Sequence, residues 1–284
     1  MIPAAFDYHK ASSVAEAVGL LKEHGMDAKI LAGGHSLIPA MKLRLNQPEI
    51  LIDISGIAAL KGIKDEGRKL VIGAACTHAA IASSAEVNSG APILAETAKV
   101  IGDIQVRNKG TIGGSIAHAD PAADWPAALI AADSTIEVLG GSGSRTIAAA
   151  DFFTGIYDTA LEEDEVIVAI HVPKVSSTFT SAYAKFFQPA SRFAIVGCAV
   201  VMEMKDNYCV SARVAFTGVA DTPFFDEKVS SALAGKTLND ETIAAAVALA
   251  AQGTDILGDH FASEEYRAHL AQVYAERAIR AAIA

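Results

Sequence analysis

Two stretches of this chain share one unusual pattern. Residues 101–124 read IGDIQVRNKGTIGGSIAHADPAAD, and residues 30–45 read ILAGGHSLIPAMKLRL. Each contains a Gly-Gly pair, at 33–34 and 113–114, that follows apolar residues and lies near a hydroxyl side chain. Glycine permits positive φ and a close backbone approach, but it weakens a helix or a strand. One such pair is an ordinary turn, whereas two matching pairs indicate two clamps on one ligand.

The composition excludes several classes of protein. The 284-residue chain has a net charge of −10 and 51% hydrophobic residues. A nucleic-acid partner is not expected, because phosphate contacts need clustered Lys and Arg. No apolar run reaches the roughly 18 residues that a membrane span needs. The start, MIPAAFDYHK, lacks the basic and apolar regions of a secretory signal. We therefore predict a cytoplasmic protein with no membrane span.

Cysteine and histidine patterns do not predict a metal site in this chain. The three cysteines form neither a C-x-x-C motif nor a disulfide framework. His118, Asp120 and Asp124 are ligand types, but their spacing matches no standard ligand pattern. We interpret His118 and Asp120 as turn residues around Pro121.

Hydrophobic periodicity predicts an α+β chain. Residues 12–25 are expected to form a helix with Ser13 and Glu16 as a capping box and Gly25 at its end. Short apolar runs flanked by glycine or proline, AKILAGG and EILIDI, predict buried strands. The next expected elements are hairpins at 60–74 and 134–147, helices at 77–87, 92–101 and 124–133, and a strand at 165–173.

The pattern changes near residue 175, where a domain boundary is predicted. Residues 174–181 are polar and form the best linker candidate. Two long β-rich runs, 193–204 and 208–219, predict an antiparallel hairpin. The expected elements that finish the chain are helices at about 222–235, 240–252 and 263–283.

The two glycine segments have the composition of an anion site, although neither is a Walker A or a Rossmann motif. Amides at a strand end followed by a helix form a concave array of donors for phosphate oxygens. A helix dipole contributes only ~0.3–1 kcal/mol, but each amide bond to a charged oxygen contributes about 1.5–3 kcal/mol. An acidic protein can therefore hold a pyrophosphate without lysine. The alternative is that both segments are tight turns.

Three motifs carry a resemblance to a known family. Together with ILAGGHSLIPAMKLRL and IGDIQVRNKGTIGGSIAHADPAAD, the segment LGDHFASEEYRAHLAQV resembles the FAD-binding medium subunit of molybdenum hydroxylases. This is the family of the carbon monoxide dehydrogenase medium subunit and the xanthine dehydrogenase FAD-binding subunit. The resemblance covers essentially the whole chain.

The resemblance implies an α+β FAD-binding fold of the vanillyl-alcohol oxidase (PCMH) type. An FAD-binding domain would span residues 1–175, with two subdomains split near residue 56. Residues 176–284 would form a C-terminal domain of the carbon monoxide dehydrogenase flavoprotein type, an antiparallel sheet with helices.

The resemblance also implies which residues hold the cofactor. Both glycine segments would wrap the FAD pyrophosphate, while Asp124 would lie near its polar chain and Leu161, Lys185 and Phe193 near the isoalloxazine ring. Serine stands at 115 where the family often has asparagine, and Arg192 precedes Phe193 where the family commonly has an acidic residue. The full set of expected cofactor-binding residues is Ile30, Leu31, Ala32, Gly33, Gly34, His35, Ser36, Leu37, Ile101, Thr111, Ile112, Gly113, Gly114, Ser115, Asp124, Leu161, Lys185 and Phe193, with no catalytic residue and no metal ligand among them.

Three functions are compatible with these observations. The leading hypothesis, implied by the resemblance, is an oxidoreductase subunit that passes electrons through FAD to an external acceptor. A molybdopterin-binding large subunit and a 2Fe-2S small subunit would be its partners, in a dimer of heterotrimers. Clusters need sets of four cysteines, so three cysteines place any cluster in another chain. The alternatives are a self-contained FAD-dependent oxidoreductase and a nucleotide-binding regulatory module without redox activity.

Overall fold

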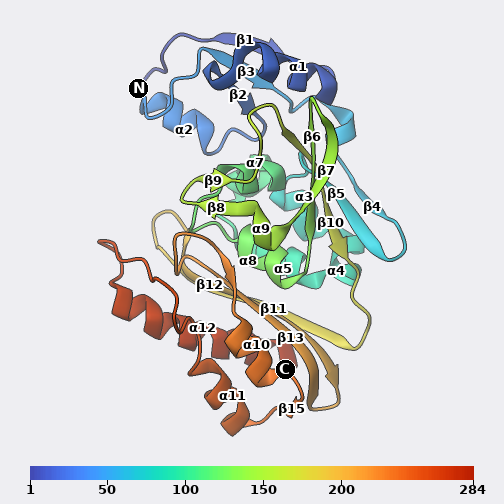
Figure 1. Ribbon diagram of the computed structural model, residues 1–284, viewed down its shortest axis with the longest axis vertical. Helices are drawn as coiled ribbons and strands as arrows, with labels where there is room; N and C mark the ends of the chain where they lie inside the picture. Colours follow the sequence, from blue (N-terminus) through green and yellow to red (C-terminus); the bar gives the residue numbers. More distant parts are fainter.

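The computed structural model describes all residues, 1–284. Three larger sheets follow one another along the long axis of the molecule (Figure 1), and a fourth sheet has only two short strands. The N-terminal lobe has a parallel sheet in the order β1-β3-β2. Parallel neighbours need crossover connections, and helices supply both of them. The lobe consists of β1 (Asp7–Lys10), α1 (Val14–His24), the 3₁₀ turn Gly25–Asp27, β2 (Ala28–Leu31), α2 (Leu37–Lys42) and β3 (Ile50–Asp53).

The middle region has an antiparallel sheet in the order β4-β5-β10-β6-β7, and most of the short helices belong to it. Its elements are the 3₁₀ turn Ala58–Leu60, β4 (Ile63–Asp65), β5 (Lys69–Gly73), α3 (His78–Ser83), α4 (Ala85–Gly90), α5 (Pro92–Val100), α6 (Ile104–Lys109), α7 (Ile112–His118), α8 (Trp125–Ala131), β6 (Thr135–Gly140), β7 (Gly143–Ala148), α9 (Ala149–Phe152), β8 (Phe153–Gly155), β9 (Asp158–Thr159) and β10 (Val166–Pro173).

The C-terminal region has an antiparallel sheet in the order β11-β12-β13-β14, and β15 also pairs with β13. Helices α5 and α8 pack on one face of this sheet, and α12 packs on the other (Figure 1). The region consists of β11 (Phe179–Phe187), β12 (Ala194–Lys205), β13 (Tyr208–Thr217), β14 (Phe224–Phe225), α10 (Glu227–Leu233), β15 (Lys236–Thr237), α11 (Asp240–Val247) and α12 (Glu264–Ile283).

Strand β12, in the interior of the C-terminal sheet, has a long apolar run because both of its faces are covered. Residues 194–202 of β12 are all buried. Ala199 and Val201 belong to the core beneath α5 and α8, whereas Cys198 and Val200 belong to the core beneath α12. A strand covered on both faces has no solvent side to carry polar residues.

Local signals predicted several elements well. Helix α1 begins after Ser13, whose hydroxyl accepts from the Glu16 amide at 3.1 Å, and Gly25 ends the helix with φ 53°. The Glu16 carboxylate accepts from the Ser12 amide rather than from that of Ser13, so the capping box is shifted by one residue. The mixed helix and sheet class is confirmed.

Other expectations were wrong in detail. The predicted helix over 77–87 is two helices, because the Ser84 hydroxyl caps a new helix by accepting from Val87 N. The predicted linker 174–181 is shorter, because β11 begins at Phe179. None of the helices is at once long enough and apolar enough to span a bilayer.

One buried arginine connects three segments of the C-terminal region. Arg267 of α12 is 5% exposed. Its guanidinium donates to the carbonyls of Ile195 and Gly218 and to the Asp259 carboxylate. Hydrogen bonds to a charged group are stronger than those between neutral groups, and a buried carbonyl that loses its donor lowers the free energy of unfolding.

We therefore expect Arg267→Leu to lower the free energy of unfolding by about 3 kcal/mol, as measured by urea denaturation. Arg280→Leu on the same helix is the matched control. Arg280 forms ion pairs only with exposed carboxylates, so its loss should change stability little. Equal effects of the two variants would show that Arg267 does not connect these segments.

Candidate functional site

The two glycine segments lie in direct contact, although they belong to different regions of the fold. A Cβ atom on Gly33 would lie 2.2 Å from the carbonyl oxygen of Lys109 and 2.9 Å from Cα of Gly110. One Cβ placed on Gly114 would lie 3.9 Å from the Ala32 Cβ. The β2–α2 connection and the start of α7 therefore pack backbone against backbone, which only glycine permits.

The second glycine pair lies in a helix and not in a tight turn. Gly113 and Gly114 lie in the first turn of α7, and the Thr111 hydroxyl caps this helix by accepting from Gly114 N at 3.1 Å. Gly113 is required by packing, because a Cβ there would lie 2.7 Å from the Ala74 carbonyl oxygen and Cβ. Its amide donates to that carbonyl. The pair therefore brings the helix N-terminus close to β5.

The first glycine segment presents a row of free backbone donors. The amide groups of residues 32–37 donate to no acceptor within the protein, and the Thr111 amide is free as well. Gly34 has φ 76°, which suits glycine. His35 is exposed, and its Nε2 lies 3.2 Å from the Gln105 carbonyl oxygen, so its ring connects the segment to α6. Unpaired amides beside a helix N-terminus form a site for phosphate oxygens.

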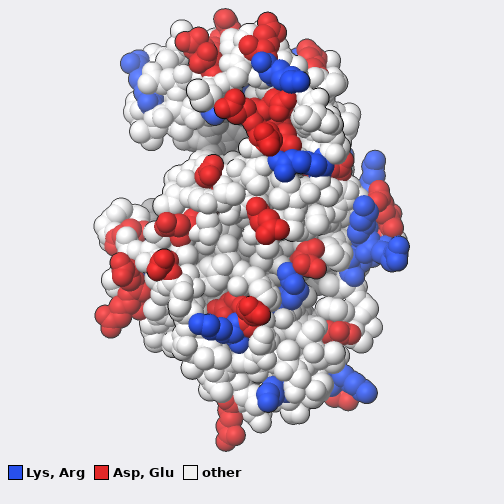
Figure 2. All heavy atoms as spheres, viewed as in Figure 1, with Lys and Arg blue, Asp and Glu red and all other residues white.

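The surface around these segments agrees with a site made of backbone donors. Figure 2 shows the surface indented between the N-terminal lobe and the rest of the molecule, on the side of α2. On this face Lys and Arg gather at the edge beside β4 and at the end of the seam away from α2, and the indented side near α2 shows mostly other residues. The Arg107 guanidinium is held in place by Nη1, which donates to the carbonyls of Ile101 and Gly102.

Asp124, at the start of α8, is held by two side chains of the C-terminal sheet. Tyr183 Oη donates to Oδ1 at 2.6 Å, and Lys185 Nζ donates to Oδ2 at 2.9 Å. The ion pair is almost fully buried, with side chains 7% and 4% exposed. Burial raises the pKa of Asp124, which Lys185 and Tyr183 oppose. Burial, and then the Asp124 charge, raise the pKa of Tyr183 well above 10, so its phenol remains a donor.

Lys185 also connects this pair to the β11–β12 loop. Its Nζ donates to the Arg192 carbonyl at 2.8 Å. Arg192 has φ 63° and its guanidinium lies 5.7 Å from the centre of the Phe187 ring. Phe193 follows, 40% exposed at the surface.

The remaining expected residues surround the glycine segments or lie farther along the chain. Ile30 and Ala32 pack on the core of the N-terminal lobe, and Ile101 and Leu161 pack on the core of the middle region. Ile112 is fully buried. Leu31, Ser36, Leu37 and Ser115 are partly exposed.

Asp120 is a turn residue, as predicted, and its Oδ1 accepts from the Ala122 amide. His118, which was predicted to belong to the same turn, is instead the last residue of α7.

Sequence reasoning missed two polar residues of this region, Tyr183 and Thr217. Tyr183 bonds to Asp124, and the Thr217 hydroxyl contacts the carbonyls of Pro121 and Ala123 at 2.8 and 2.7 Å. No sequence signal distinguished them, because β11 and β13 each carry several other polar residues.

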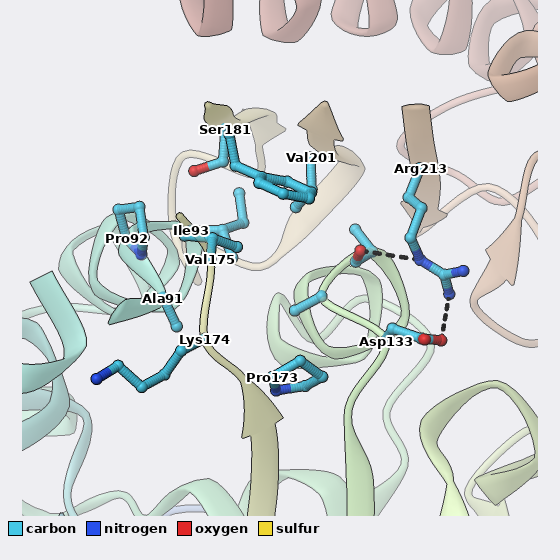
Figure 3. A pocket seen from close by; sticks show the side chains of 13 residues that line it. Ala91, Pro92, Ile93, Asp133, Pro173, Lys174, Val175, Ser181, Val201 and Arg213 are labelled. Carbon is cyan, nitrogen blue, oxygen red and sulfur yellow. Dashed lines mark hydrogen bonds and ion pairs between the residues drawn. The ribbon is translucent and has the colours of Figure 1, made fainter. Parts of the chain in front are cut away.

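A separate cavity of about 220 Å³ lies where α5 and α8 meet the C-terminal sheet (Figure 3). Its lining includes Ile93, Val175 and Val201, and Arg213 at its rim is paired with Asp133 at 2.9 Å. None of the expected cofactor-binding residues lines this cavity.

Two protein-family models match the chain and together cover most of it. Residues 4–175 match the FAD binding domain in molybdopterin dehydrogenase. Residues 181–282 match the CO dehydrogenase flavoprotein C-terminal domain. This chain belongs to the family of FAD-binding medium subunits of the molybdopterin dehydrogenases. The predicted family, its FAD-binding fold and its flavoprotein C-terminal domain are thereby confirmed.

Relatives of this family match over nearly the whole length of both chains. The carbon monoxide dehydrogenase medium chain of Hydrogenophaga pseudoflava is 45% identical, covering 99% of this chain and 98% of that one. The xanthine dehydrogenase FAD-binding subunit of Escherichia coli O157:H7 is 29% identical, covering 98% and 96%.

Solved structures of such enzymes match as closely. A chain of carbon monoxide dehydrogenase from Hydrogenophaga pseudoflava has a TM-score of 0.96 at 45% identity, covering 99% of this chain and 98% of that one. A chain of quinoline 2-oxidoreductase from Pseudomonas putida 86 has a TM-score of 0.94 at 31% identity, covering 100% and 98%. One medium-subunit fold therefore occurs in enzymes whose names give different substrates.

The contact at Gly33 predicts a stability effect. We expect Gly33→Ala to lower the free energy of unfolding by about 2 kcal/mol, because its Cβ must displace the Lys109 backbone. Gly19→Ala in α1 is the control, since its Cβ would meet nothing within 4 Å and alanine favours a helix. Urea denaturation measures both. A stable Gly33→Ala protein would contradict the close backbone contact.

The buried histidine behind the second glycine segment predicts a pH dependence. His78 Nδ1 accepts from Trp125 Nε1 at 3.0 Å, and burial, then the charges of His35 and Arg107, lower its pKa from 6.5 to about 4. Between pH 6.5 and 4, His78 binds a proton in the unfolded chain but not in the folded protein. Stability should therefore fall as pH drops from 6.5 to 4, by about 3 kcal/mol in all.

Urea denaturation across this range tests the dependence with two variants. His78→Gln removes the titrating group, so it should flatten the slope between pH 6.5 and 4. His269→Gln changes an exposed histidine and should keep the wild-type slope. A wild-type slope in His78→Gln would show that another group is responsible.

Proposed function

We propose that this subunit holds FAD by its pyrophosphate on the contact between the two glycine segments, and passes electrons from partner clusters to an external acceptor. The observation that supports the proposal most directly is the row of free amides at residues 32–37, beside the capped start of α7. Each amide bond to a charged oxygen contributes about 1.5–3 kcal/mol. The donor set thus fits an anion without requiring a lysine.

The residues proposed to bind the cofactor fall into two groups. The free amides of residues 32–37 and of Thr111 would hold the phosphates, and side chains near the β11–β12 loop would lie close to the isoalloxazine ring. The proposed set is Ile30, Leu31, Ala32, Gly33, Gly34, His35, Ser36, Leu37, Ile101, Thr111, Ile112, Gly113, Gly114, Ser115, Asp124, Leu161, Lys185 and Phe193.

The protein contributes binding and orientation, whereas bound FAD would supply the electron-accepting chemistry. Glycine lets the phosphates approach the backbone, and the α7 dipole favours negative charge there. Lys185 neutralises Asp124 and orders the loop that carries Phe193. This role requires no general acid or base from the chain.

We further propose that the chain consists of an FAD-binding domain and a C-terminal domain, with the boundary at residue 175. We also propose that it works as one subunit of a complex. All three cysteines are buried and unpaired, and a cluster needs four ligands. The electrons would therefore arrive from a 2Fe-2S small subunit, and substrate would be oxidised on a molybdopterin-binding large subunit. The relatives named medium chains support these partners, and a dimer of heterotrimers is the assembly that we propose.

A charge placed at the proposed phosphate site tests the function. We expect Gly114→Asp to abolish FAD retention in the complex assembled with large and small subunits, because the carboxylate would repel the pyrophosphate. Gly114→Asn is the neutral control of the same shape and should retain substantially more FAD. Both variants place a Cβ 2.9 Å from Thr111 Oγ1, so this local strain is common to the pair and only the charge differs. The measurement is FAD per complex after acid release, with FMN as the comparison ligand.

Electron transfer is tested in the same complexes. Carbon monoxide is the first substrate to try, because two relatives are carbon monoxide dehydrogenase medium chains. In Gly114→Asp, substrate should still reduce the clusters, but their reoxidation by the external acceptor should be lost. Turnover of a small molecule by the isolated FAD-loaded chain would instead support a self-contained oxidoreductase. Equal retention of FMN and FAD would contradict the pyrophosphate site.

A further inference from the structure

We infer that the C-terminal domain clamps the turn after α7, and that Thr217 is the positioning residue through which it controls how firmly FAD is held. The clamp consists of Thr217 and Gly218 at the end of β13 and Ala194 at the start of β12. It acts on the turn of residues 120–124, which joins α7 to α8. This inference rests on the proposed function, because it assigns α7 to the cofactor site.

Two backbone hydrogen bonds and one side-chain hydroxyl form the clamp, and the single hydroxyl proton is shared between two carbonyls. The Ala194 amide donates to the Ala122 carbonyl at 3.0 Å, and the Gly218 amide donates to the Pro121 carbonyl at 2.8 Å. The Thr217 hydroxyl lies within hydrogen-bonding distance of two carbonyls, those of Pro121 and Ala123. The C-terminal sheet therefore holds the backbone of the turn residue by residue.

Thr217 is the only residue that contributes a side chain to this clamp, and it is buried. It is 1% exposed, so water does not compete for the two carbonyls. Gly218 has φ 76°, and a Cβ there would lie 2.6 Å from the Ile195 carbonyl oxygen. Glycine at 218 thus brings the end of β13 close to the start of β12, and both reach the same turn.

Helix α7 depends on contacts at its two ends. It has seven residues, two of them glycine, and glycine is among the poorest helix formers. A helix of this length is not stable by itself, so tertiary contacts decide its position. At its start the amides of Ile112 and Gly113 donate to the carbonyls of Cys76 and Ala74. At its end the chain turns at Ala119, with φ 48°, directly into the clamped segment.

The neighbouring ion pair extends the same hold by one residue. Tyr183 and Lys185 bind the Asp124 carboxylate, which follows the clamped carbonyls directly. The C-terminal domain thereby grips residues 121–124 through backbone and side chains alike. A shift of this turn would move α7, and with it the Gly114 end that faces Ala32.

The test compares three variants in the assembled complex. Thr217→Val keeps the shape but removes the hydroxyl, whereas Thr217→Ser keeps the hydroxyl. Thr180→Val is the matched control, because the Thr180 hydroxyl is buried in the same sheet without a partner. We expect Thr217→Val to release FAD about tenfold faster and to shift the flavin absorption, while Thr217→Ser and Thr180→Val behave like the wild type.

A second readout does not depend on FAD. Hydrogen–deuterium exchange on the flavin-free complex should be faster over residues 112–120 in Thr217→Val, with residues 264–283 of α12 unchanged. Unchanged exchange over 112–120 overturns the clamp, and so does faster exchange that spreads equally to α12. Faster local exchange with wild-type FAD release overturns its link to the cofactor. A wild-type complex that binds no FAD refutes the proposed function instead, and exchange still decides the clamp.

Discussion

The close approach of Gly33 to the Lys109–Gly110 backbone is the contact on which the site depends. A single Cβ atom at residue 33 would overlap a carbonyl oxygen. Because the two segments meet without intervening side chains, the N-terminal lobe and the start of α7 share one surface. The amides of residues 32–37 therefore have no partner within the protein, and they lie beside the N-terminus of α7.

This arrangement explains how a chain with a net charge of −10 can hold an anionic dinucleotide. Fixed amides supply donors without adding positive side chains, and they need no reorganisation when the ligand binds. Lys185, which is expected near the ring, is already paired with Asp124 and with the Arg192 carbonyl. In the proposed site its role is to order a loop, which would make the C-terminal domain part of that site.

Local physics made part of this structure predictable. Ser13 and Gly25 identified the ends of α1, and apolar runs identified β2, β3 and β12. The pairing of the two glycine segments followed from their likeness, and the family resemblance supplied the cofactor. The helical state of Gly113 and Gly114 was not predictable, because glycine pairs normally interrupt helices. It results from the Thr111 cap and from packing on Ala74. The partners of Asp124 depend on how two distant sheets dock, and no local pattern encodes that contact.

The most direct measurement is amide hydrogen exchange at single-residue resolution on the assembled complex, with and without FAD. If the free amides hold the pyrophosphate, FAD should protect residues 33–37 and Thr111 by at least tenfold, while exposed amides such as those of β7 remain unchanged. Protection confined to the β11–β12 loop, with residues 33–37 exchanging as fast as without FAD, would contradict the account.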